Sequence, residues 1–159
     1  MIVKSMRSFF APLVILLALP LAGCESLKAS ADLVLETSRM DQPTDALTGK
    51  SQFREGNFGL AEEAFRRAVE KDPGDAESWL GLGATHDQLR RFDLADRDYA
   101  QVERLVGRNA ALLNNRGFSY LMRGNFPKAR ADLTAARALD PGNPDIESNL
   151  AAAIRGRRI

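Results

Sequence analysis

The chain has 159 residues, of which 45% are hydrophobic and 27% are charged. This composition is typical of one folded domain and excludes a largely disordered protein. The 22 basic and 21 acidic residues nearly balance, so the sequence has no basic excess with which to bind nucleic acid. A single cysteine and a single histidine exclude an intramolecular disulfide and a structural zinc site built from Cys and His side chains.

The first 23 residues have the three-part pattern of a secretory signal. A start that contains Lys4 and Arg7 but no acidic residue precedes an apolar run. This run has about 11 residues, and as a helix it covers about 17 Å of a hydrocarbon core of about 30 Å, too little for a membrane span. Without Lys4 and Arg7 the basic residues fall from 22 to 20 against 21 acidic residues, a net charge of −1.

The end of this segment, Leu21-Ala22-Gly23-Cys24, resembles the lipobox of bacterial lipoproteins. The resemblance implies cleavage before Cys24 and covalent lipid on its thiol and on the new amino group, and several acyl chains anchor a protein stably. Glu25 stands where an aspartate retains enterobacterial lipoproteins in the inner membrane, so the periplasmic face of the outer membrane is expected. The alternatives are an ordinary signal peptide with a chance cysteine and a simple N-terminal anchor. No other cofactor is expected.

Residues 24–41 form the lipidated N-terminus of the expected mature chain. This stretch contains little Gly or Pro and includes the apolar run Leu33-Val34-Leu35. It can form a short helix that packs on the following domain, or a partly ordered tether. The short helix is favoured.

A repeat of 34 residues organises the chain from residue 42 onward. The triplet Gly-Asn-Phe at 56–58 recurs unchanged at 124–126, with Arg90-Arg91-Phe92 midway between the two copies. Small, apolar and helix-breaking residues follow the same spacing: Ala61, Ala95 and Ala129; Phe65, Tyr99 and Leu133; Pro73, Gly107 and Pro141. A period of this length with these residues predicts two antiparallel helices in each repeat.

The repeat register predicts seven helices. Asp75 and Asn109 are expected N-caps, while Pro127 and Pro144 fit first-turn positions. The expected helices lie near 44–55, 58–71, 76–89, 92–105, 110–123, 126–139 and 144–155. Packing between them is expected from Gly49, Gly83 and Gly117, which allow close approach, and from Phe58, Phe92 and Phe126, which fill the remaining space.

These features resemble the tetratricopeptide repeat family over Gln42–Asn143, with the best match in the segments Trp79–His86 and Gly117–Pro141. The resemblance implies an all-α, right-handed superhelix with repeats at 42–75, 76–109 and 110–143, followed by a capping helix and basic tail at 144–159. The capping helix is expected to pack through Leu150 and Ile154. Residues that depart from the family pattern are Asp45 and Thr48, which predict a first helix that is frayed or packed by the preceding segment, and Arg116.

The sequence contains no recognisable combination of nucleophile, general base and supporting residue for catalysis. His86 occupies a helix-packing position that Tyr120 holds in the next repeat, and no partner cysteine is available once Cys24 carries lipid. The acidic residues Asp93, Asp96 and Asp98 alternate with arginines, which favours a solvated helix face over a cation site. We therefore expect neither an enzyme nor a metal site, and we keep a periplasmic enzyme that acts through His86 as an alternative.

A groove on the concave side of the superhelix is the expected binding surface. Resemblance to the family implies that fixed positions of each first helix face it, and Phe118 is the strongest single candidate. The groove lacks a ring of basic residues for an acidic C-terminal tail, and its small depth favours a partner helix or extended segment over a small molecule. The candidate groove residues are Lys50, Arg54, Glu77, Ala84, Asp87, Asn114, Asn115, Phe118, Met122, Ser148 and Asn149.

The segment from Asn114 to Tyr120, followed by Gly124, Asp140-Pro141 and Asn149-Leu150, looks like the final repeats of the lipoproteins of tight-adherence (Tad, Flp) pilus systems. This resemblance implies a non-enzymatic scaffold at the outer membrane that holds or delivers a secretin or another pilus-assembly subunit. The alternatives are a general envelope adaptor, for example one that recruits peptidoglycan enzymes, and a pilotin-like lipoprotein of type IV pili.

Overall fold

The computed structural model describes residues 44–156, so Cys24, Glu25 and the expected tether at 24–41 lie outside the described residues. The described chain forms α2 (Asp45–Arg54), α3 (Phe58–Lys71), α4 (Ala76–Gln88), α5 (Phe92–Val106), α6 (Ala110–Met122), α7 (Phe126–Leu139) and α8 (Pro144–Ile154). Every boundary lies within one residue of the position that the repeat register predicts. The all-α fold of stacked helix pairs is confirmed.

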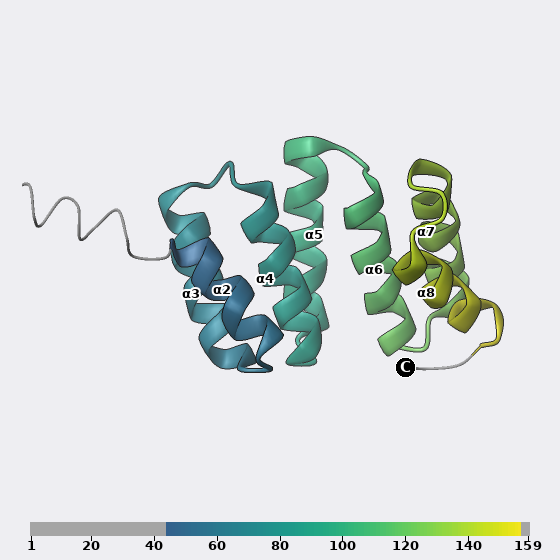
Figure 1. The fold of residues 1–159 in the computed structure, drawn as a ribbon, viewed down its shortest axis with the longest axis horizontal. Helices are drawn as coiled ribbons and strands as arrows, with labels where there is room; N and C mark the ends of the chain where they lie inside the picture. Colours follow the sequence, from purple (N-terminus) through teal and green to yellow (C-terminus); the bar gives the residue numbers. More distant parts are fainter. Residues whose placement is uncertain (1–43, 157–159) are drawn as a thin grey trace, which may run out of the picture. The chain divides into compact units, whose positions relative to one another are not determined.

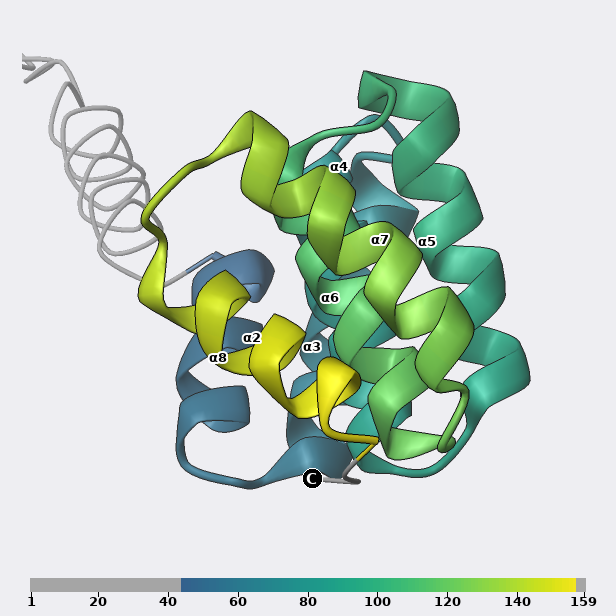
Figure 2. The same ribbon diagram turned by 90° about the vertical axis from the view of Figure 1, so that its right-hand side faces the viewer.

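The helices pack as three successive pairs and a final single helix (Figure 1). Each pair consists of neighbours in the chain, α2 with α3, α4 with α5 and α6 with α7, and α8 packs on both α6 and α7 (Figure 2). Contacts between the pairs run from α3 to α4 and from α5 to α6, and also from α2 to α4, from α4 to α6 and from α6 to α8. The four helices α2, α4, α6 and α8 therefore form one continuous layer, the inner layer, which carries the candidate groove.

The predicted helix starts are present. The Asp75 carboxylate accepts hydrogen bonds from the backbone N–H groups of Glu77 and Ser78, and the Asn109 side chain accepts one from Leu112. Pro127 and Pro144 lie in the first turns of α7 and α8, where their missing N–H groups leave no helix hydrogen bond unmade. Local capping chemistry thus sets the boundaries of these helices.

Large side chains fill the space next to Gly49, Gly83 and Gly117, the glycines that recur every 34 residues. A methyl group at each of these glycines would lie 2.6 to 2.8 Å from a buried side chain of the following helix. The prediction that Phe58, Phe92 and Phe126 fill this space is wrong, because those rings are only half-buried near the turns. The pairs in contact are Gly49 with Phe65, Gly83 with Tyr99, and Gly117 with Leu133.

Two of the three residues that depart from the family pattern, Asp45 and Arg116, make ion pairs. Asp45 pairs with Lys71 and, at 2.9 Å, with the Nε atom of Arg67, so α2 is tied to α3 rather than frayed. Hydrogen bonds from Lys71 and Arg67 hold the pKa of Asp45 below its usual value. Arg116 pairs with Asp132 at 2.7 Å and with Glu103 at 2.8 Å, which joins α5, α6 and α7. Polar contacts therefore replace the expected apolar packing at these positions.

The turn between α4 and α5 differs from its counterparts. Gly56 and Gly124 have φ values of 79° and 73°, and Arg90, at the same repeat position, has a φ of 61°. A side chain in this left-handed region costs about 1 to 2 kcal/mol. The middle repeat thus forms the same turn between its two helices as the other repeats, but with arginine in place of the glycine that suits this conformation best.

The final helix α8 covers the end of the stack through Ile146, Leu150 and Ala153, which are buried. The prediction that Ile154 packs there is wrong, because its side chain is 63% exposed. Residues 146, 150 and 153 follow the helical period and form one stripe, and residue 154 is rotated about 100° from residue 153. Ala153 therefore takes the position expected for Ile154.

Candidate protein-binding groove

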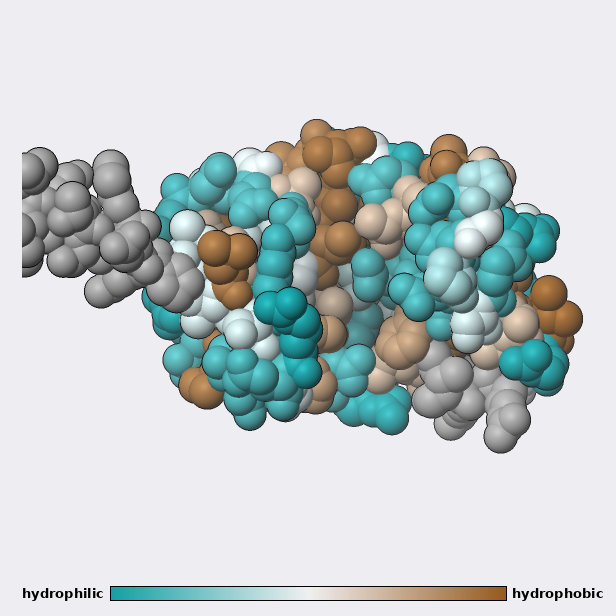
Figure 3. Space-filling model, viewed as in Figure 1, coloured by the Kyte–Doolittle hydropathy of each residue, from teal (hydrophilic) through white to brown (hydrophobic). Residues whose placement is uncertain are grey.

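The inner layer is hollowed by two adjoining pockets, which together we call the groove. The first pocket has a volume of about 310 Å³ and lies between α4, α6 and α8, and the second has a volume of about 460 Å³ and lies between α2 and α4. Phe53, Ala84 and Asn115 line both pockets, so the hollow is continuous. Figure 3 shows this face, with α2 and α8 standing forward on either side of the recessed centre.

The structure brings most of the predicted groove residues together. Ten of the eleven candidates line one pocket or the other, and Met122 lines neither. The first pocket contains Asp87, Asn114, Phe118, Ser148 and Asn149, the second contains Lys50, Arg54 and Glu77, and Ala84 and Asn115 belong to both. Their contact with a partner stays a prediction.

Some residues that line the groove were not among the candidates predicted from the sequence. Phe53, Leu80 and Gln88 line the groove, and in the repeat register they hold the twelfth, fifth and thirteenth positions of their first helices. These are the positions that the family resemblance assigns to the groove, so the same rule could have found them. Asp145 holds the second position of the capping helix, the position of Glu77 in the second repeat, so the rule could have found it as well. Tyr99 belongs to a second helix, and no such rule identifies it.

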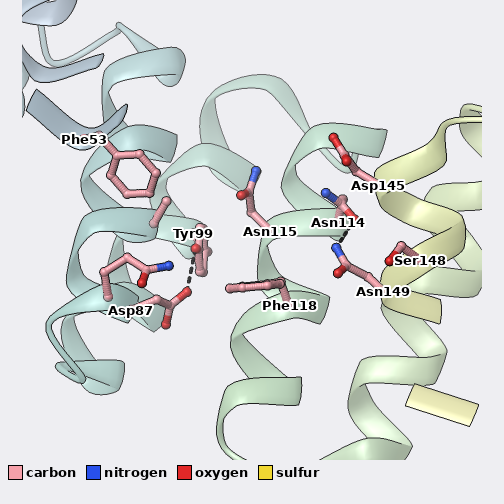
Figure 4. A pocket seen from close by; sticks show the side chains of 11 residues that line it. Phe53, Asp87, Tyr99, Asn114, Asn115, Phe118, Asp145, Ser148 and Asn149 are labelled. Carbon is pink, nitrogen blue, oxygen red and sulfur yellow. Dashed lines mark hydrogen bonds between the residues drawn. The ribbon is translucent and has the colours of Figure 1, made fainter. Parts of the chain in front are cut away.

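Polar side chains along the groove are already partly paired. The Nζ atom of Lys50 lies 2.6 Å from the Oε1 atom of Glu77, which links α2 to α4 across the second pocket. The Asn149 side chain donates a hydrogen bond of 3.1 Å to Oδ1 of Asn114, visible as a dashed line in Figure 4. The remaining donors of Asn114 and the Oδ1 atom of Asn149 can serve a bound backbone.

Asp87 forms the centre of a buried network beside the first pocket. Its side chain is only 1% exposed, and its carboxylate accepts hydrogen bonds from the Tyr99 hydroxyl at 2.7 Å and the Ser119 hydroxyl at 2.5 Å. Burial raises the pKa of Asp87, although these hydrogen bonds and the charge of Arg123 act in the opposite direction. Asp87 therefore fixes α4 against α5 and α6 and forms the floor of the pocket rather than an open contact surface.

His86 lies in a second buried cluster, away from the groove. Its Nδ1 atom is 2.6 Å from Oδ2 of Asp98, and its Nε2 atom is 3.5 Å from Oε1 of Glu62. The prediction that Asp98 belongs to a solvated face is wrong, because Asp98 is 6% exposed. The residue faces α4, and the single histidine supplies its hydrogen-bonding partner. The cluster joins α3, α4 and α5.

This cluster predicts a pH dependence of stability. Burial lowers the pKa of His86, but the hydrogen bond with Asp98 and the charges of Asp98 and Glu62 outweigh it, so the pKa is raised above 6.5. The folded state then holds this proton more tightly than the unfolded state. We expect the free energy of unfolding to fall as pH rises from about 6.5 through the folded pKa, by up to about 1.4 kcal/mol per pH unit.

Urea unfolding between pH 6 and pH 9 measures this slope. The variant His86→Asn serves as the control, because its side-chain amide can donate to Asp98 from the position of Nδ1 but does not titrate. The slope should flatten in His86→Asn. Equal slopes in the two proteins would show that His86 is not the group responsible.

The described residues offer neither an evident metal site nor a membrane span. Within residues 44–156, no three His, Cys, Asp or Glu side chains are arranged to hold a metal ion. None of the helices over the same range is long and apolar enough to cross a bilayer.

Comparisons with known proteins identify the repeats. Tetratricopeptide repeat family models match residues 47–95 and 110–143. The chain is also 33% identical over 109 residues to the type IV pilus assembly protein PilF of Pseudomonas aeruginosa. This match covers 67% of the chain but only 43% of PilF, so the chain spans less than half the length of that relative.

Solved structures show the same fold. The second tetratricopeptide repeat domain of human RPAP3, determined in complex with an HSP70 peptide, has a TM-score of 0.62 at 22% identity, covering 70% of this chain and 92% of that domain. The Yersinia enterocolitica type III secretion translocator chaperone SycD has a TM-score of 0.61 at 21% identity, with coverage of 70% and 89%. The chain is therefore a tetratricopeptide repeat protein, a member of a family of non-catalytic scaffolds for protein–protein interaction, and a distant homologue of PilF.

Proposed function

We propose that this protein is a lipid-anchored scaffold of the bacterial cell envelope that binds a segment of another protein in the groove and thereby assists pilus assembly. The observation that carries the proposal is the continuous groove on the inner layer, which gathers ten of the eleven candidate groove residues. Similarity to PilF, whose name describes a type IV pilus assembly protein, favours pilus assembly over a general envelope adaptor.

The groove suits an extended or helical protein segment. The two adjoining pockets can each receive a side chain, while Asn114 and Asn149 offer amide groups in the first pocket for hydrogen bonds to a backbone. Phe118 and Phe53 supply apolar contact area. In our proposal the segment belongs to a secretin or to another pilus-assembly subunit.

The finer assignment is a lipoprotein of the TadD type, which acts in tight-adherence pili. It is supported by the likeness of the segment Asn114–Tyr120 and of the final helix to that group. The alternative within the same class is a pilotin-like lipoprotein of type IV pili, which the similarity to PilF supports. In both, the lipid on Cys24 would hold the groove near the periplasmic face of the outer membrane.

The groove is tested by the double variant Phe118→Ala with Asn114→Ala. Because the first pocket loses its aromatic wall and the amide pair, we expect crosslinked capture from envelope fractions to recover at least about tenfold less partner than wild type. The control is Leu60→Ala, which removes an exposed apolar side chain outside the groove. Thermal melts should show that both variants fold. Recovery of every partner at the wild-type level would contradict the proposal.

The anchor is tested separately with Cys24→Ala in the full chain. Without a thiol the protein cannot accept the lipid, so we expect metabolic labelling with palmitate to disappear and the protein to leave the membrane fraction. Retention of label would refute the assignment of Cys24, while the groove proposal would stand.

A further inference from the structure

We propose that the pocket between α4, α6 and α8 receives a lysine or arginine side chain of the bound segment, so that the groove selects partners by a basic residue. The inference rests on the proposed function, because it assumes that a protein segment occupies the groove. It adds to that function the type of side chain that one of the two pockets binds.

The charged groups that line this pocket are all negative, and its other polar groups are neutral. Asp87 and Asp145 contribute carboxylates, Asn114, Asn115 and Asn149 contribute amides, and the eleven lining residues include no Lys, Arg or His. Figure 4 shows Asp145 on α8 at one side of the pocket and Asp87 on α4 at the other. A side chain that enters between these two helices therefore meets the exposed carboxylate of Asp145, while the buried carboxylate of Asp87 lies in the floor of the pocket and accepts the Tyr99 and Ser119 hydroxyls.

The Asp145 carboxylate is available for a ligand. It is exposed in the first turn of α8, and no basic side chain of the described range pairs with it. The situation of Asp87 is different, because its carboxylate is buried and already accepts hydrogen bonds from the Tyr99 and Ser119 hydroxyls. In the other pocket Lys50 and Glu77 neutralise each other. Asp145 is thus the uncompensated charge at the mouth of the pocket and the expected partner for a cation.

Aromatic rings complete the fit to a basic side chain. Phe53 and Phe118 line the pocket, and Phe118 extends from α6 toward Asp87 (Figure 4). A lysine or arginine can lay its apolar stem along such rings while its cationic end reaches a carboxylate, and an aromatic face also attracts a cation directly. An acidic side chain in the same place would be repelled.

The adjoining pocket has the complementary character. Leu47, Phe65 and Leu80 make its walls largely apolar, and Lys50 and Arg54 also line it. A segment that fits both pockets therefore carries an apolar residue toward α2 and a basic residue toward α8. Charge also orients the segment along the groove.

An array of synthetic peptides of random sequence, probed with the purified full chain, tests the inference. We expect the bound peptides to be enriched in lysine or arginine at a fixed distance from an apolar residue. For one bound peptide, fluorescence anisotropy then gives the Kd of the parent and of versions in which the basic residue is exchanged for glutamine, glutamate or the other basic residue.

The matched protein variants are Asp145→Asn and Glu147→Gln. Both remove one negative charge from the first turn of α8, but Glu147 does not line the pocket. We expect Asp145→Asn to weaken the parent peptide about tenfold and Glu147→Gln to leave the Kd within about twofold. In the glutamine version of the peptide, the effect of Asp145→Asn should vanish, because the two changes remove the same contact. Asp145→Glu should restore most of the affinity.

The outcomes separate this inference from the proposed function. Peptides that bind without a preference for basic residues, or a parent peptide that binds Asp145→Asn as tightly as wild type, would overturn the basic-residue pocket while leaving a peptide-binding groove. If the array captures nothing above a blank surface, the groove proposal fails and this inference fails with it.

Discussion

Replacement of Phe65 by alanine is expected to lower the free energy of unfolding by about 3 to 5 kcal/mol. The Phe65 ring is 2% exposed and lies between two glycines, since methyl groups at Gly49 and Gly81 would come within 2.8 and 2.5 Å of it. Glycines have no side chain that could move into the space left by the ring. The cavity therefore persists, and the loss should reach the upper part of the range.

Urea unfolding followed by circular dichroism measures this loss. The control is Phe58→Ala, which removes the same ring from a half-buried position where it contacts Phe53 edge-on, with 5.4 Å between the ring centres. Its loss should be clearly smaller. Equal destabilisation by the two variants would contradict the packing described for the first repeat.

The second large effect is expected from Gly83→Ala. Its new methyl group would lie 2.8 Å from Cε1 of Tyr99, whose hydroxyl donates to the buried Asp87. Because this hydrogen bond holds the tyrosine, the ring cannot move aside without leaving a buried carboxylate short of a donor. We expect a loss of about 2 to 3 kcal/mol, although alanine favours a helix over glycine by about 1 kcal/mol.

A matched substitution in the same domain has the opposite expected sign. Gly59 lies in α3, and a methyl group there meets nothing within 4 Å. Gly59→Ala should therefore gain about 0.5 to 1 kcal/mol from helix propensity alone. Comparison of the two melting temperatures separates close packing from backbone preference. A stable Gly83→Ala protein would mean that the repeats tolerate wider helix spacing.

The helices and their order could be predicted because their signals are local. The helix starts are set by side chains that act on backbone groups within a few residues: Asp75, Asn109, Pro127 and Pro144. Because the repeat occurs three times with one length, each copy also predicts the helix boundaries of the other two. The same register identified part of the groove lining. Such features depend on spacing along the chain, which the sequence contains directly.

The wrong predictions concern contacts between helices. Asp98 was expected in solvent on the basis of neighbouring arginines, but the partner that decides its position is His86, 12 residues away on another helix. Ile154 was assigned to the core by hydrophobicity, while Ala153 lies on the buried stripe. Distances and rotations between packed helices decide such cases, and no local pattern records them.

The hydrogen bond between Asp87 and Ser119 has a consequence for how the domain unfolds. It is buried and joins residues 32 positions apart in adjacent repeats, and a more exposed ion pair joins Arg91 to Glu62 in the repeat before. In a linear array each repeat is stabilised chiefly by its neighbours, so strong links between them make the array lose structure in one step rather than fray from its ends. The groove, which spans all the repeats, is then either present as a whole or absent.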